Sequence, residues 1–240
     1  MLILAADTSG KSLSVSLCED DKSLIETTLN LGYKHSVAFQ PLIDEVIRRS
    51  GRDKKEIELF ASAAGPGSFT GIRIGVAAIK TMAWALGKPA IGVSSLETLA
   101  AAFPGSIVCP VLDARGGRVF SGLYKVTGKP AELLKPANRQ ADDLWQDIIE
   151  LGPTSEPPLT SIIVVGDGLP AVKAARPQNL PEINVIWTTP EHWAPRAAVL
   201  SRLAYLKYKE GDQGDPFALM PQYLSLSQAE RLKKQADKQN

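Results

Sequence analysis

Cysteine and histidine, which often mark catalytic or metal sites, are scarce in this chain of 240 residues. Its two cysteines, Cys18 and Cys109, form no CxxC pair, so the sequence predicts reduced thiols and no disulfide framework. Its two histidines, His35 and His192, lie far apart without HxxH or HxxxH spacing or clustered carboxylates. No GxSxG motif occurs. We therefore expect neither a metal enzyme nor a nucleophilic hydrolase.

An excess of one charge is also lacking. Lys and Arg number 27 against 26 Asp and Glu, so the net charge of +1 gives no general attraction to nucleic acid or to an anionic membrane. The opening residues MLILAAD have no basic region and too short an apolar run for a signal peptide, and Lys80 interrupts the longest apolar stretch. The sequence predicts a cytoplasmic protein, with any link to RNA made through a partner.

The stretch from residue 63 to residue 92 joins a glycine-rich turn to an unusually apolar helix. Gly65, Gly67 and Gly71 permit backbone angles that other residues avoid, and Ser68 or Thr70 can cap a helix that begins near residue 70. Beyond its first turn that helix has few polar residues, so most of its sides must be covered. Two interpretations stay open: the chain itself covers the helix on all sides, or a second subunit covers one of them.

Apolar periodicity places the remaining elements in two similar units. In the first unit the pattern predicts a hairpin (2–6 and 13–17), a strand (23–29), a helix from 35 that stops at Gly51, a strand (57–63), the apolar helix and a strand (90–93). Pro41 is able to shift the start of the first helix. The second unit repeats the order of strand, acid, turn and strand (107–112 and 119–126), then predicts a short helix (141–151), a strand (162–165) and a helical turn (171–176). A last helix spans 195–208, and the polar tail after Tyr223 should fray.

Two loops carry the candidate binding residues. Residues 5–12, AADTSGKS, nearly fit the GxxxxGK[ST] loop that cradles phosphates, but Ala5 replaces its first glycine and a strand follows where that loop requires a helix. Asp7 either caps its own turn or holds Mg²⁺ beside amides that hold phosphate. Gly65–Gly71 either binds an anion at the helix start, helped by Arg73, or lets backbone and helix approach closely. The candidate nucleotide or phosphate residues are Asp7, Thr8, Ser9, Gly67, Ser68 and Arg73.

Five motifs in order make the chain resemble the TsaB (YeaZ) family. They are Asp7-Thr8-Ser9, His35-Ser36, GPGSFTGIRIG (65–75), GVSSLETLA (92–100) and Asp113-Ala114-Arg115. The match spans residues 1 to about 125 and thins afterwards to Gly166-Asp167-Gly168 and Pro221-Gln222-Tyr223-Leu224. Ser225 departs from the usual arginine after the Tyr-Leu pair, so the resemblance assigns no phosphate or partner contact there.

The resemblance implies an α/β protein of the actin-like and sugar-kinase-like superfamily, with two lobes of ribonuclease-H-like topology and a reduced second lobe. We expect the first lobe in residues 1–104 together with the returning helix 195–208, the second lobe in 105–194, and a flexible tail in 224–240.

The function that the resemblance implies is that of a noncatalytic partner of TsaD, the subunit that transfers the threonylcarbamoyl group to adenosine 37 of tRNAs reading ANN codons. Ser95 and Leu99 stand where TsaD-like proteins carry an HxxxH metal pair, and leucine supplies no ligand atom. The resemblance also implies TsaE as a third member, a homodimer when the chain is alone, ATP and Mg²⁺ used by the complex, and tRNA contacted only through the complex. It assigns this chain no catalytic residue, metal or cofactor of its own.

The family's pairing mode implies an interface made by helices 36–49 and 70–86, which would cover the excess apolar surface. The predicted interface residues are Phe39, Leu42, Val46, Ile72, Val76, Ile79, Lys80 and Ala83. Glutamate at Val76 or Ile79 should then abolish the heterodimer and leave a folded monomer. Two rival functions stay open: a self-sufficient actin-like ATPase or small-molecule kinase that uses Asp7 and the glycine loop, and, less favoured, a peptidase.

Overall fold

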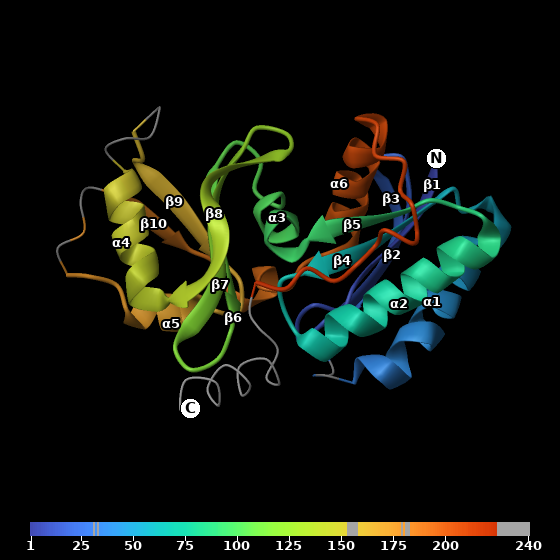
Figure 1. Ribbon diagram of the computed structural model, residues 1–240, viewed down its shortest axis with the longest axis horizontal. Coiled ribbons are helices and arrows are strands. Elements are labelled where there is room, and N and C mark those ends of the chain that lie inside the picture. Colours follow the sequence, from blue (N-terminus) through green and yellow to red (C-terminus); the bar gives the residue numbers. More distant parts are fainter. Residues whose placement is uncertain (31, 33, 153–157, 179, 181–182, 225–240) are drawn as a thin grey trace, which may run out of the picture.

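Two mixed sheets of five strands form the framework of the protein (Figure 1). The computed structural model describes residues 1–30, 32, 34–152, 158–178, 180 and 183–224. The first sheet has the order β3-β2-β1-β4-β5 and the second the order β10-β9-β6-β7-β8, so β6 holds the central place that β1 holds in the first. Each sheet joins an antiparallel three-strand meander to two parallel strands, which is the ribonuclease-H-like topology that the sequence predicted.

The strands of the first sheet are β1 (Leu2–Asp7), β2 (Leu13–Glu19), β3 (Lys22–Leu29), β4 (Leu59–Gly65) and β5 (Ala90–Ser94). Those of the second are β6 (Ile107–Asp113), β7 (Arg118–Val126), β8 (Pro130–Gln140), β9 (Ser161–Val165) and β10 (Asn184–Trp187).

Helices cover both faces of the first sheet, so every residue of β1 is buried. On one face α1 (His35–Ser50) and α2 (Phe69–Leu86) pack against Leu4 and Ala6, and on the other α6 (Ala197–Lys209) packs against Ile3 and Ala5. The short helix α3 (Ser95–Ala100) lies between the two sheets (Figure 1). The other helical elements are α4 (Ala141–Leu151), α5 (Leu169–Ala174) and the 3₁₀ turns η1 (Lys54–Glu56) and η2 (Pro190–His192).

The second lobe is smaller in its helices, since α5 has 6 residues where α2 has 18, while its sheet keeps five strands. The boundary that we predicted near residue 104 falls between α3 and β6, and the division into domains stays a prediction. The tail predicted to be flexible lies outside the described residues from 225 onward.

Most of the predicted elements are present, with two strands missed. Pro41 lies inside α1, which nevertheless begins at His35; Gly51, predicted as its stop, follows the last helical residue in a left-handed conformation. The strands β8 and β10 were not predicted, because Pro130 and Pro136 in β8 argue against a strand and β10 has only 4 residues. Both missed strands lie at the edges of the second sheet, where proline is tolerated.

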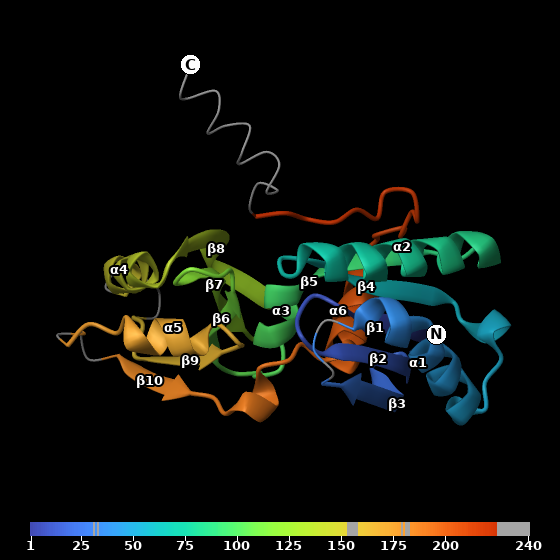
Figure 2. The ribbon, with the colours of Figure 1, turned by 90° about the horizontal axis from the view of Figure 1, so that it is seen from below.

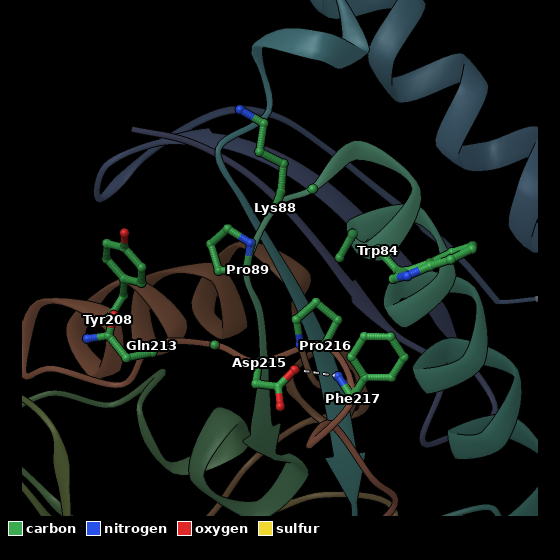
Figure 3. Close-up of a pocket in the computed structure, with 11 residues that line it drawn as sticks. Trp84, Lys88, Pro89, Tyr208, Gln213, Asp215, Pro216 and Phe217 are labelled. Carbon is green, nitrogen blue, oxygen red and sulfur yellow. Dashed lines mark hydrogen bonds between the residues drawn. The ribbon is translucent and has the colours of Figure 1, made fainter.

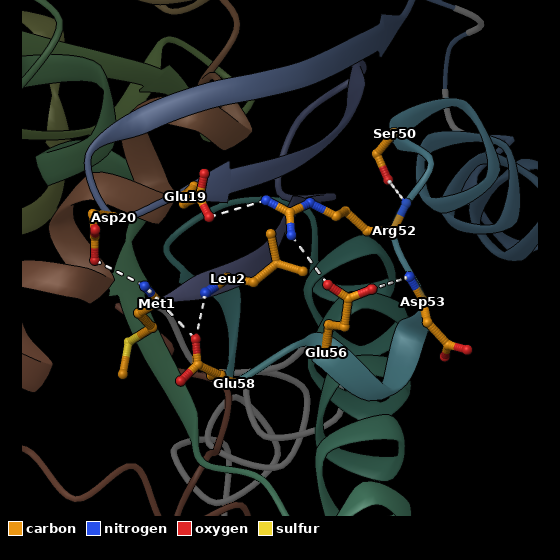
Figure 4. Close-up of polar contacts among 9 residues, drawn as sticks. All are labelled: Met1, Leu2, Glu19, Asp20, Ser50, Arg52, Asp53, Glu56 and Glu58. Carbon is orange, nitrogen blue, oxygen red and sulfur yellow. Dashed lines mark hydrogen bonds and ion pairs between the residues drawn. The ribbon is translucent and has the colours of Figure 1, made fainter.

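A small polar network closes one end of the first lobe (Figure 4). The amino group of Met1 donates to Asp20 over 3.0 Å, and the guanidinium of Arg52 contacts both Glu19 at 3.0 Å and Glu56 at 3.1 Å. These contacts join the start of the chain to the β2–β3 turn, and η1 to the end of β2. Because these groups are largely exposed and screened by water, each pair adds little to stability.

After α6 the chain returns across the first lobe as an extended C-terminal segment, residues 211–224, which runs beside α2 (Figures 1 and 2). The amide of Ala90 donates to the carbonyl of Gly214, and the amide of Gln222 donates to that of Ala64, both over 2.6 Å. Leu219 is buried in the core beneath α2. The sequence analysis did not predict this path, which has no regular secondary structure to detect.

Candidate functional site

The glycine-rich turn before α2 packs directly on the loop after β1. A Cβ atom on Gly67 would lie 2.3 Å from the carbonyl oxygen of Ser9, and one on Gly71 would lie 2.1 Å from that of Thr8. The amide of Ser68 donates to the Ser9 carbonyl over 2.7 Å. These glycines therefore serve the close approach of two backbones, which was one of the two interpretations of the sequence.

Ser68 caps α2, as the sequence suggested, by accepting a hydrogen bond from the amide of Gly71 over 3.2 Å. The hydroxyl of Thr8 donates to the carbonyl of Gly71 over 2.7 Å, which ties the β1 loop to the first turn of the helix.

Asp7, at the end of β1, is 1 % exposed. Its Oδ1 accepts hydrogen bonds from the amide of Ser9 at 2.9 Å and from its hydroxyl at 2.7 Å, so Asp7 caps its own turn. Its Oδ2 is buried and has no hydrogen-bond partner among the described residues. Burial raises the pKa of this carboxyl to about 6, with the bonds from Ser9 acting in the opposite direction.

A nucleotide with Mg²⁺ fits this loop only in part. The free Oδ2 of Asp7 is an atom that could bind a cation. The amides of Ser9 and Ser68, however, donate within the protein and are not offered to a phosphate in this arrangement. The six candidate nucleotide-binding residues thus stay a prediction, and we derive no chemistry through a bound nucleotide.

The raised pKa of Asp7 predicts a loss of stability as the pH rises. In the pH range between the ordinary value near 4 and the folded value of about 6, the folded state binds the proton that the unfolded state has lost. Stability should therefore fall through this range, by up to about 3 kcal/mol, and then level off. Asp7→Asn should remove most of the fall. Urea unfolding of both proteins between pH 4 and pH 8 measures it, and equal pH dependence in the two would contradict the assignment.

Arg73 points away from this loop and toward the C-terminal segment. Its Nε donates to the hydroxyl of Tyr223 over 2.8 Å, and its guanidinium carbon lies 3.8 Å from the centre of the Phe69 ring. The rings of Phe69 and Tyr223 stack with their centres 5.0 Å apart. Arg73 therefore fastens the segment to α2, and its role as a phosphate ligand stays a prediction.

The second lobe repeats the acidic loop of the first. Asp113 is the last residue of β6 as Asp7 is the last of β1, and its amide donates to Oδ1 of Asp167 over 2.9 Å. A Cβ atom on Gly166 would lie 2.0 Å from the carbonyl oxygen of Val111, so a glycine again permits close backbone contact. Burial raises the pKa of Asp167, and the positive charge of Lys11 from the first lobe opposes that rise. The loops of the two lobes thus lie near each other.

The apolar side chains predicted to meet a partner lie inside the protein. Between 0 % and 4 % of each is exposed, and they form the core under α1 and α2; they are Phe39, Leu42, Val46, Ile72, Val76, Ile79 and Ala83. Lys80, the eighth predicted residue, donates to the carbonyl of Phe217 over 3.0 Å. A partner would therefore contact other, exposed residues of these helices. The prediction chose the wrong face because the sequence of a helix that is apolar all round does not show which face points to solvent.

The outward row of α2 consists of Thr70, Arg73, Ala77, Thr81 and Trp84. Large apolar side chains are exposed along this helix and the adjoining segment: Trp84 is 62 % exposed, Phe217 66 %, Met220 61 %, Tyr223 43 % and Phe69 40 %. Val37 on the neighbouring α1 is 73 % exposed. We call the face made by α2 and the adjoining segment the outer surface: the outward row of α2, Phe69, and the exposed side chains Phe217, Met220 and Tyr223. Sequence reasoning missed Phe217 and Met220, and only the motif at 221–224 signalled the segment.

A hollow of about 430 Å³ lies at the C-terminal end of α2 (Figure 3). Trp84 of α2 and Phe217 of the C-terminal segment form one side of the hollow. Pro89, which precedes β5, and Tyr208 of α6 also line it. Oδ1 of Asp215 accepts a hydrogen bond from the amide of Phe217 over 2.8 Å, which holds the turn that forms the hollow. The hollow continues the outer surface and is suited to an apolar side chain of a partner.

Other kinds of site find little support in the part of the chain that the structure describes. It contains no group of three or more His, Cys, Asp or Glu residues placed to hold a metal ion. Ser95 and Leu99, at the positions considered for a metal pair, are both buried in α3. By length and composition α2 alone among the described helices could cross a membrane, which is weak evidence because a core helix passes the same test.

Comparison with known proteins gives consistent relatives. The profile of the tRNA N6-adenosine threonylcarbamoyltransferase family (TsaD) matches residues 31–182. The tRNA threonylcarbamoyladenosine biosynthesis protein TsaB of Bacillus subtilis is 34 % identical over 233 residues, covering 96 % of both chains. TsaB of Escherichia coli is 33 % identical over 134 residues, covering 52 % of this chain and 55 % of its own. The structure of YeaZ from Pseudomonas aeruginosa superposes with a TM-score of 0.76 at 23 % identity, covering 93 % of this chain and 99 % of that one.

Proposed function

Because this chain belongs to the TsaB (YeaZ) family of tRNA threonylcarbamoyladenosine biosynthesis proteins, we propose that it is a noncatalytic partner of TsaD in that pathway. In this role it binds TsaD and is required for formation of the threonylcarbamoyl group on adenosine 37 of tRNAs that read ANN codons. The reaction itself takes place on TsaD.

The outer surface is the observation that carries this proposal. Trp84, Phe217 and Met220 are each more than 60 % exposed and lie on one helix and the segment beside it. A concentration of large apolar side chains on one face is typical of an interface with another protein. The profile match of this chain to TsaD covers α1 and α2, so TsaD would present a similar pair of helices.

The proposal that this chain is a pseudoenzyme rests on the absence of an assembled set of catalytic groups in the described residues. Ser95 and Leu99 occupy the positions where, by the resemblance, TsaD-like proteins carry metal-binding histidines. The amide of Ser9 and the hydroxyl of Thr8 are engaged within the protein. The charged residues of the outer surface are few, which suits protein contact better than direct binding of tRNA.

We further propose the wider assembly that the resemblance implies. TsaE joins the complex as its third member, ATP and Mg²⁺ are used by the complex, and tRNA is reached through TsaD. The chain forms a homodimer when alone and exchanges it for the heterodimer, because the outer surface serves both contacts. All of these steps take place in the cytoplasm.

One observation favours the rival function of an independent ATPase: Oδ2 of Asp7 is buried and has no hydrogen-bond partner among the described residues. Lys11 of the same loop carries a positive charge that acts on Asp167 in the second lobe. Hydrolysis of ATP by the purified chain alone measures this directly. The peptidase has no such observation in its favour.

The deciding experiment is threonylcarbamoyl transfer to tRNA by TsaD and TsaE supplied with the threonylcarbamoyl adenylate, with and without this chain. We expect transfer that depends on this chain and none from this chain alone. Turnover by this chain alone, or full transfer in its absence, would overturn the proposal. Binding to TsaD measured in the same preparations separates loss of assembly from loss of catalysis.

A further inference from the structure

Arg73 is the charged residue of the outer surface, and the protein does not neutralise it. The helix α2 contains no Asp or Glu. Its other cation, Lys80, donates to the carbonyl oxygens of Phe217 and Leu219 over 3.0 and 3.4 Å. Arg73 forms no ion pair within the part of the chain that the structure describes, and its side chain is exposed. The outer surface therefore carries one unpaired positive charge among large apolar side chains.

The guanidinium of Arg73 is held in place although it is exposed. Its Nε donates to the hydroxyl of Tyr223 over 2.8 Å, and its central carbon lies 3.8 Å from the centre of the Phe69 ring and 5.7 Å from that of Tyr223. Its two terminal nitrogens have no hydrogen-bond partner among the described residues. Because the side chain is already ordered by these contacts, a ligand that bonds to the terminal nitrogens pays little further entropy.

The cavities described at this face do not receive the guanidinium. The hollow beside Trp84 lies at the other end of α2. A second, smaller cavity of about 120 Å³ between the lobes is lined by Gln222 and Leu224 among others, and Arg73 is not part of its lining. A ligand for Arg73 must therefore come from outside, as water in the free protein and as a group of the covering molecule in a complex.

From these contacts we propose that Arg73 binds a carboxylate of the partner that covers α2. The inference rests on the proposed function, under which this partner is TsaD. A carboxylate matches the two free nitrogens with parallel N–H···O hydrogen bonds and supplies the missing negative charge. Once an apolar partner excludes water, an unpaired guanidinium opposes binding, so a partner that fits this face brings an acid. With Arg73 so paired, a carboxylate introduced at Ala77, one turn further along, finds no free cation in the complex.

A second copy of this chain is a poorer source of that carboxylate. The outer surface contains no Asp or Glu, so two copies joined face to face bring two arginines and no acid from this surface. Asp215 lies beside it in the hollow, but its Oδ1 already accepts a hydrogen bond from the amide of Phe217. Arg73 therefore favours TsaD over a second copy, which gives the exchange of homodimer for heterodimer its direction.

The test is the affinity of Arg73→Met for TsaD, measured by titration calorimetry, together with the self-association of the same variant, measured by analytical ultracentrifugation. Methionine keeps an unbranched apolar side chain and good helix propensity but lacks the charge. We expect TsaD to bind at least about 30-fold more weakly, and the homodimer to be unchanged or tighter. Arg73→Lys keeps the charge without the paired donors and should recover only part of the loss. Arg176→Met, at an exposed arginine of the second lobe, should bind TsaD as the unaltered chain does.

Tyr223→Phe separates pairing from positioning, because it removes the hydroxyl that Arg73 bonds to and keeps the charge and both rings. Its affinity for TsaD should stay within about 3-fold of that of the unaltered chain. A loss as large as that of Arg73→Met would show that Arg73 acts by fastening the segment, and would overturn the proposal. Equal weakening of the homodimer would place the carboxylate on a second copy and overturn it as well.

Two further outcomes count against the proposal. Weaker binding of tRNA to the assembled complex, with unchanged affinity of Arg73→Met for TsaD, would place an RNA phosphate at Arg73. Equal affinity of the variant and the unaltered chain for TsaD, with tRNA binding also unchanged, would refute this inference alone. If the unaltered chain does not bind TsaD, the proposed function fails together with it.

Discussion

Replacing Ala77 by glutamate will weaken binding to TsaD by at least about 100-fold while leaving this chain folded. Ala77 lies in the outward row of α2 and is exposed, so the new carboxylate meets water in the free protein. In the complex it would be buried against an apolar partner without a counter-charge, at a cost of about 2–5 kcal/mol. Titration calorimetry with purified TsaD measures the affinity, and circular dichroism checks the fold.

Two further variants make this result specific. Ala174→Glu places the same charge at an exposed alanine on α5 in the second lobe and should bind TsaD as the unaltered chain does. Val76→Glu, which the sequence suggested as an interface test, should instead unfold the protein, because Val76 is 4 % exposed within the core. Unchanged affinity in folded Ala77→Glu would show that the outward row of α2 is not part of the interface. It would not decide the role in the pathway, which the transfer assay tests separately.

Gly71→Ala is expected to destabilise the protein by at least about 3 kcal/mol, although it adds a single methyl group. That methyl carbon would lie 2.1 Å from the carbonyl oxygen of Thr8. Cβ atoms in proteins essentially never lie closer than 3.0 Å to such an atom. The β1 loop and the first turn of α2 must then separate, which breaks the hydrogen bond from Thr8 to the carbonyl of Gly71. Chemical denaturation gives the free energy of unfolding.

Gly10→Ala is the matched control, since it adds the same methyl group in the neighbouring loop after β1 but meets nothing within 4 Å. Its free energy of unfolding should stay within about 0.5 kcal/mol of the unaltered protein. If Gly71→Ala were equally mild, the close approach of the two loops would not be a requirement of the fold.

The sequence predicted the central strands well because a short apolar run that ends at turn residues is a strong local signal. β1 and β6 are buried runs that each end in aspartate, and both appear where they were expected. Edge strands such as β8 depend on pairing with β7 more than on their own composition, so Pro130 concealed it. Local pattern does not report pairing between distant segments.

The candidate site was predicted less completely, for a different physical reason. Asp7 and the glycine turn were identified, yet only the folded chain shows that the amide of Ser9 donates to the Asp7 carboxylate and the amide of Ser68 donates to the Ser9 carbonyl. For α2 the sequence indicated excess apolar surface without its direction, since Ile72, Val76 and Ile79 resemble Ile74 and Ala77 in polarity. The contacts of Arg73 with Tyr223 join residues 150 positions apart, which no local pattern reveals.

The C-terminal segment touches two places at once. At one end Phe217 forms a wall of the hollow beside Trp84, and at the other Gln222 and Leu224 line the cavity between the lobes. A protein bound over α2 and any group bound in that cavity would thus both contact one continuous stretch of backbone. If either occupant prefers one position of that strip, thermodynamic linkage requires each to change the affinity of the other by the same factor.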